Sequence, residues 1–126
     1  MSITKNHKLL TNTFSKEELR INKIIGNSKL FEDATILDAG FGGCHELRIR
    51  HISTQLSKRG KGHASRALKW LCNLADKEHL NITLCPVVMN SGGLNHSQLV
   101  LWYRRHGFIC YGEEEEEMIR YWKGKI

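Results

Sequence analysis

The chain has 126 residues and a formal charge of +6, with 40% hydrophobic and 8% aromatic residues. Compact domains typically contain ~100–150 residues, so we expect a single domain over 1–126 and no second substrate-binding lobe. No apolar stretch approaches the ~18–20 residues of a membrane span, and Met1–Lys8 lacks the apolar core of a signal peptide. The sequence therefore predicts a soluble, cytoplasmic protein with no membrane partner.

The four cysteines are spaced widely and irregularly, at Cys44, Cys72, Cys85 and Cys110. No Cys-x-x-Cys pair or local cysteine–histidine cluster has zinc-ligand spacing. His45-Glu46 begins like a zinc-protease helix, but Ile49 stands where the second histidine belongs. We expect reduced thiols packed as small hydrophobes, and no metal.

Charge is distributed unevenly along the chain. Glu113–Glu117 contains five of the thirteen acidic residues, so the rest carries eight acids against nineteen Lys and Arg, a charge of +11. This excess suits contact with nucleic acid or a phosphate-bearing ligand. It equally suits a solvated surface, and charge alone does not separate the two.

The first half of the chain predicts a helix and two strands. Ser15 has the capping-box spacing to Glu18 and begins a helix that reaches Ile25. Thr35–Ala39 is short and apolar, and the glycines of Gly40–Gly43 predict a break and a hairpin turn. His45–Ser53 alternates polar and apolar residues, which predicts a strand with one packed face.

The second half predicts two helices and three strands. Apolar residues at helical spacing indicate a helix from Ala64 to His79, and Ile82–Cys85 is a buried strand stopped by Pro86. A loop with Asn90, Gly92 and Gly93 leads to a helix over His96–His106, closed by Gly107. Phe108–Tyr111 and Met118–Trp122 are strands joined by the glutamate run. This order of elements is typical of a mixed α/β sheet.

The segment Arg59–Ser65 lies between a predicted strand and the start of a helix. Free backbone N–H groups and the helix dipole make such a position an anion site, where glycines allow close approach and Arg59 and Lys61 add charge. A basic turn with glycines for tightness is the alternative. Walker A spacing is absent, and Ser65 stands where a dinucleotide-binding fingerprint needs glycine.

Two motifs resemble the Gcn5-related N-acetyltransferase (GNAT) superfamily. Arg59-x-x-Gly62-x-Ala64 is similar to its pyrophosphate-loop signature Gln/Arg-x-x-Gly-x-Gly/Ala. Tyr103-x-x-x-Gly107-Phe108 is similar to its later Tyr-x-x-x-Gly-Phe segment. The resemblance covers about residues 46–122, and the chain is identified as a short member of this superfamily.

The resemblance implies the fold and the cofactor. It implies an α/β GNAT fold, with a mixed, mostly antiparallel sheet flanked by helices and a splay between the fourth and fifth strands. It also implies an acetyl-CoA-binding core over about 45–122, behind a short acceptor-side region over about 1–44. The implied cofactor-binding residues are Ile52 and Thr54 at a strand bulge, the loop residues Arg59, Gly60, Lys61, Gly62, His63, Ala64 and Ser65, and Asn95.

The resemblance also implies catalytic roles. Tyr103 matches the tyrosine that protonates the departing thiolate, although a core aromatic beside Trp102 is the alternative. Glu46 matches a catalytic glutamate and would act as general base; otherwise it is a solvent-facing carboxylate alternating with arginines. His51 is a weaker candidate for the same base.

The expected function is transfer of acetyl from acetyl-CoA directly to a primary amine. The acceptor is a protein lysine or N-terminus, a small amine, or aminoacyl-tRNA, and the enzyme is a monomer or homodimer. The run Glu113–Glu117 suits a cationic acceptor or is a solvated loop. The alternative is an inactive, basic GNAT-like protein that binds nucleic acid or a protein. A methyltransferase interpretation starts from the glycine-rich Ile36–Gly43 but requires a helix directly afterwards.

Overall fold

The computed structural model describes residues 16–25, 28–43, 45–87, 94–113 and 116–123. Its elements, in chain order, are α2 (Lys16–Ile25), β1 (Ser28–Phe31), β2 (Thr35–Gly43), β3 (Glu46–Thr54), the 3-10 turn η1 (Leu56–Lys58), α3 (His63–Glu78), β4 (Asn81–Leu84), α4 (His96–Arg105), β5 (Ile109–Tyr111) and β6 (Glu117–Arg120). The predicted helices and most predicted strands are confirmed within a few residues, whereas β1 was not predicted. Ser15 and the loop residues Asn90, Gly92 and Gly93 lie outside the described residues.

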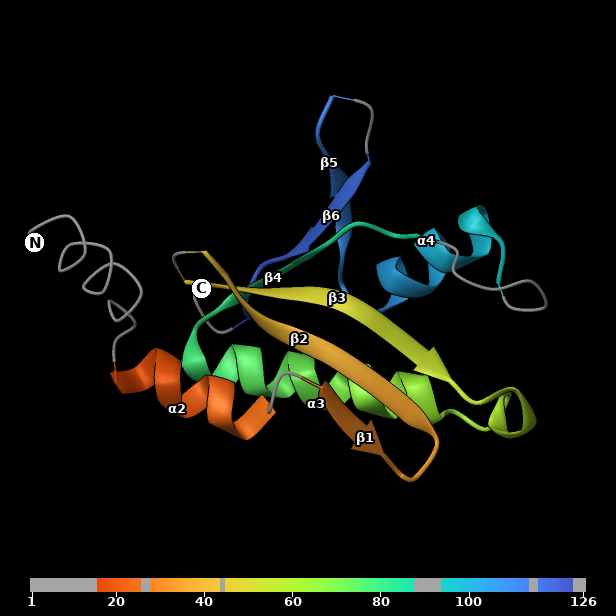
Figure 1. Cartoon of the computed structure of the whole chain (residues 1–126). Helices are drawn as coiled ribbons and strands as arrows, with labels where there is room; N and C mark the ends of the chain where they lie inside the picture. The colour runs from red at the N-terminus through yellow and green to blue at the C-terminus, as the bar shows by residue number, and fades with distance from the viewer. Residues whose placement is uncertain (1–15, 26–27, 44, 88–93, 114–115, 124–126) are drawn as a thin grey trace, which may run out of the picture.

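The six strands form one sheet in the order β1-β2-β3-β4-β6-β5. Only β3 and β4 run parallel, and the other neighbouring strands are antiparallel. Helices α2 and α3 lie on the same side of the sheet, and the β5–β6 hairpin projects away from them (Figure 1). The predicted fold class, a mixed and mostly antiparallel sheet flanked by helices, is confirmed.

The sheet opens between β3 and β4. These strands pair from Glu46 with Asn81 to Ile49 with Leu84, and beyond this point they diverge (Figure 1). At the same place Arg50 has no counterpart in β2, since Ala39 pairs with Ile49 and Asp38 with His51. An extra residue in one strand is a β-bulge, which bends the strand and increases its twist. In the strand order of the GNAT fold these two strands are the fourth and fifth, so the predicted splay is confirmed, and it lies between β3 and β4 of this chain.

The predicted position of the bulge is wrong. Ile52–Thr54 pairs in register with β2, so the irregularity precedes this segment. The predicted break at Gly40–Gly43 is also wrong, because these glycines continue β2. A Cβ at Gly42 would lie 2.6 Å from the Cβ of Arg48, so only glycine lets β2 approach β3 this closely. Strand β2 leads into β3 and not into a helix, which removes the basis of the methyltransferase interpretation.

The core lies between the sheet and its helices. The buried face of α3 consists of Ala67, Leu68, Leu71, Cys72 and Ala75. It packs with Leu47 and Ile49 of β3 and with Ile82 and Leu84 of β4. Of the described cysteines, which are all free, Cys72 is buried but Cys85 is exposed, so the expectation of packed thiols is wrong for Cys85. Within the described ranges, no helix combines the length and apolar character needed to cross a membrane.

A buried ion pair ties β6 to α3. The side chain of Arg120 is 5% exposed and donates to both carboxylate oxygens of Asp76, each at 2.9 Å. Arg120 also donates to the carbonyl oxygen of His106, which follows α4. This one guanidinium therefore connects three elements of the fold.

Replacing Asp76 with alanine should lower the free energy of unfolding by about 3 kcal/mol, because it leaves the buried Arg120 charge without its partner. Asp38→Ala, which removes an exposed pair with Arg50, should cost about 1 kcal/mol or less. Urea unfolding followed by circular dichroism measures both. Equal losses in the two variants would contradict this account of the Arg120–Asp76 pair.

Candidate functional site

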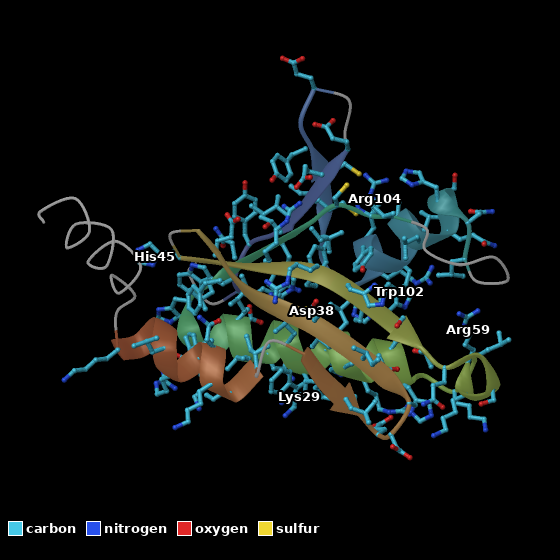
Figure 2. The ribbon with its side chains drawn as sticks, viewed as in Figure 1. Lys29, Asp38, His45, Arg59, Trp102 and Arg104 are labelled. Atoms are coloured by element: carbon cyan, nitrogen blue, oxygen red, sulfur yellow. The ribbon has the colours of Figure 1, made fainter. Side chains whose placement is uncertain are left out.

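A cavity of about 640 Å³ lies where β3 and β4 separate. Its walls are the end of β3, the loop that follows, the first turn of α3 and one side of α4. Figure 2 shows Arg59 in the turn after β3 and Trp102 on α4. Eight of the predicted cofactor residues line this cavity: Ile52, Thr54, Arg59, Gly60, Gly62, His63, Ala64 and Ser65. Lys61 and Asn95 do not.

The loop presents a run of unsatisfied backbone N–H groups. Helix α3 begins at His63, and Gly60 and Gly62 both have φ of +82°, a conformation that favours glycine. The first α3 amide that bonds a carbonyl is that of Arg66, which donates to Gly62 at 3.0 Å. The N–H groups of residues 60–65 donate to no acceptor in the described part of the chain. Together with the positive end of the helix dipole, they form a site suited to an anion.

Arg59 adds a cation to this loop. Its Nε donates to the carbonyl oxygen of Thr54 at 3.2 Å, which fixes the side chain against the end of β3. Its Nη1 is enclosed yet has no hydrogen-bond partner among the described residues. Arg59 also lines a smaller cavity of about 420 Å³ beside Ile36 and Leu56. An enclosed donor without a partner is costly, so bound anionic oxygen at this guanidinium would be favourable.

Helix α4 closes the other side of the cavity. The indole Nε1 of Trp102 donates to the Ser65 hydroxyl at 3.0 Å and thereby joins α4 to α3. No local pattern in the sequence indicates this bond, which joins residues 37 positions apart. Asn95 caps α4: its side chain accepts from the Gln98 amide at 2.8 Å, while Gln98 accepts from the Asn95 amide. This capping box engages the Oδ1 of Asn95, and Asn95 does not line the cavity.

Tyr103 lies in the core. Its ring packs edge-on against Trp102 and Phe108, with centroids 4.9 and 5.4 Å away, and the residue is 5% exposed. Burial raises the pKa of Tyr103 to about 12, so the phenol stays protonated at neutral pH. This placement matches the core-aromatic alternative. Its role as a general acid stays a prediction.

Glu46 lies far from the cavity. It begins β3, six residues before Ile52, a separation of roughly 20 Å along a strand. Its carboxylate accepts from the Thr83 hydroxyl at 2.9 Å. His51 shares a hydrogen bond with Ser53 and does not line the cavity. The structure therefore does not bring either predicted base to the cavity wall.

The last glutamate of the run Glu113–Glu117 is paired with an arginine. Arg48 binds both carboxylate oxygens of Glu117, and this hydrogen-bonded pairing lowers the pKa of Glu117. Glu117 is therefore neutralised within the chain and is less available to attract a cationic acceptor.

Comparison with solved structures identifies the fold, although no family model and no curated protein sequence matches the chain. The anti-CRISPR protein AcrVA5 is 13% identical, over 69% of this chain and 90% of its own, with a TM-score of 0.60. The ribosomal-protein-S18-alanine N-acetyltransferase from Escherichia coli is 14% identical, over 70% and 61% of the two chains, with a TM-score of 0.55. A Bacteroides thetaiotaomicron protein classed as a GNAT-family acetyltransferase is 21% identical, over 94% and 82%, with a TM-score of 0.53.

Coenzyme A is bound in two other similar structures, those of the NatC complex and of N-acetylglutamate synthase from Neisseria gonorrhoeae, with TM-scores of 0.54 and 0.52. The present chain spans about three fifths of the E. coli enzyme. These structural likenesses confirm the resemblance drawn from the two motifs at the level of the fold. The chain has the fold of the Gcn5-related N-acetyltransferases.

Proposed function

We propose that this protein is an acetyl-CoA-dependent N-acetyltransferase of the cytoplasm. The observation that carries the proposal is the run of free N–H groups over residues 60–65, which faces a cavity opened by the splay of β3 and β4. The phosphate oxygens of a pyrophosphate can accept hydrogen bonds from such a run of N–H donors. The E. coli N-acetyltransferase and the coenzyme A complexes among the similar structures support this cofactor.

The end of β3 suits an extended arm. Beyond Ile49 this strand keeps β2 on one side and has lost β4 on the other, so the backbone groups of Ile52–Thr54 on that side pair with none of the described strands. A pantetheine arm carries amides that bond to such an edge as an added strand does. The pyrophosphate would then lie at the loop and the thioester further along the opening, towards α4.

In the proposed reaction the acceptor amine attacks the thioester carbonyl carbon directly. A C–N bond forms, the C–S bond breaks, the ammonium proton passes to a base, and the thiolate receives a proton. Tyr103 is proposed as the acid, and its protonated phenol suits that role. No base is assigned, because Glu46 lies at the opposite end of β3.

One arrangement favours a second candidate, an inactive GNAT-like protein that binds nucleic acid or a protein through its basic surface. Tyr103 is buried in the core and Glu46 is remote from the cavity. Steady release of CoA with a polyamine, a peptide or an aminoacyl-tRNA as acceptor would exclude this candidate. Binding of CoA without turnover on any of these acceptors would favour it.

Gly62→Glu should abolish binding of CoA, because it places bulk and negative charge among the loop amides. Gly112→Glu is the matched control, since both glycines have positive φ and an added Cβ would meet a side-chain atom at 2.8 Å in each case. Isothermal titration with CoA measures the affinity, and a melting curve verifies that each variant folds. Equal loss of affinity in the two variants would refute the loop assignment.

Tyr103→Phe should slow acetyl transfer by roughly 10²-fold and leave the affinity for CoA nearly unchanged. Because burial holds the pKa of Tyr103 at about 12, its deprotonation contributes no loss of activity below about pH 10. Initial rates of the wild type and the variant across this pH range measure both effects. A variant as fast as the wild type would remove Tyr103 from the mechanism.

A further inference from the structure

The β1–β2 turn places two carboxylates beside the loop of residues 59–65, which we call the anion-binding loop. Glu32 and Asp33 both adopt left-handed backbone conformations, with φ of 51° and 56°. Such a pair matches the type I′ hairpin turn, which favours asparagine, aspartate and glycine. Glutamate rarely adopts the left-handed conformation. Its presence in this turn therefore indicates that its side-chain contacts have a role.

Glu32 binds two cationic or polar groups at the start of α3. Its carboxylate accepts from Arg66 Nε at 2.8 Å and from Arg66 Nη2 at 2.8 Å, and it contacts His63 Nδ1. The hydrogen bonds from Arg66, and then that from His63, lower the pKa of Glu32 to about 2. The carboxylate is therefore ionised at neutral pH.

Arg66, which binds Glu32, also contacts the backbone of the loop. Its Nη2 donates to the carbonyl oxygen of Lys61 at 3.0 Å. Its Nη1 lies against Gly62, only 2.8 Å from the position that a Cβ there would take. The Arg66 guanidinium thus links Glu32 to Lys61 and Gly62, which directly precede α3.

The acidic turn supports the loop from outside the cavity. Neither Glu32 nor Arg66 lines the cavity, whereas His63 does. Glu32 contacts side chains only, so it leaves the amides of residues 60–65 free. Asp33 adds a parallel contact, since Lys58 approaches its carboxylate at 3.5 Å and donates to its carbonyl oxygen.

We propose that Glu32 is a positioning residue for the anion-binding loop. Through Arg66 and His63 it holds residues 60–63 in the conformation that directs their amides into the cavity. The effect of Glu32 on the binding of coenzyme A rests on the proposed function. Its effect on the conformation of the loop does not. The opposite role, an internal anion that competes with the ligand, predicts the reverse effect on affinity.

Glu32→Ala tests the proposal, with Glu78→Ala as the matched control. Glu78 also binds an arginine, Arg20, at 2.8 Å, but it lies at the far end of α3. The first measurement is the backbone ¹⁵N order parameters of residues 59–66 in the ligand-free protein. These order parameters should fall in Glu32→Ala and stay unchanged in Glu78→Ala. Unchanged order parameters in Glu32→Ala would overturn the proposal.

The second measurement is the affinity for CoA by isothermal titration. Glu32→Ala should bind about tenfold more weakly than the wild type, the scale seen when a group that orients a ligand-binding residue is lost. Equal or tighter binding would overturn the proposal, and tighter binding would identify Glu32 as a competitor. If the wild type fails to bind CoA, the proposed function fails, while lower order parameters of the loop in Glu32→Ala still support the positioning role.

Discussion

The short pairing between β3 and β4 is the constraint on which the site depends. Only four residue pairs join these strands before they diverge. A strand that loses one neighbour exposes backbone donors and acceptors along that edge, and these groups need partners. The bulge at Arg50 turns β3 at this point, while β2 continues to satisfy its other edge. The sheet therefore opens at this point while its core stays packed. The loop after β3 and the first turn of α3 lie beside the opening.

The ion pairs show which of the basic residues have a carboxylate partner and which do not. Arg48, Arg66 and Arg120 are all paired with carboxylates and serve to hold elements together. Arg59 and Arg105, by contrast, line the cavity and form no ion pair with a described carboxylate. Positive charge without a partner is thus found at the wall of the cavity, where the free amides of the loop also lie. Charge and backbone donors both favour an anionic ligand there.

The features that sequence predicted well are those set by local periodicity. Alternation fixed Leu47 and Ile49 as the packed face of β3, and helical spacing fixed α3. Gly62 was recognised in the motif Arg59-x-x-Gly62-x-Ala64 before a predicted helix, and it is the N-cap of α3, with φ of +82°.

Features that depend on cross-strand register or on distant contacts were not predictable in this way. The glycines of β2 look like a turn, because the close approach of Arg48 that requires Gly42 is a property of the paired strands. Adjacent helical positions point about 100° apart, so spacing alone could not decide whether Trp102 or Tyr103 would face the cavity. The contact of Glu32 with Arg66 spans 34 residues, and no local pattern indicates it.

The most direct test of the central claim is a titration of the isotopically labelled protein with CoA, followed by the backbone amide and indole resonances. We predict that the largest shifts fall on residues 52–54, 60 and 62–65 and on the Trp102 indole, which line the opening between β3 and α4. Saturable shifts confined to these groups would establish the loop as the cofactor site. No shift, or shifts centred on the β5–β6 hairpin, would contradict it.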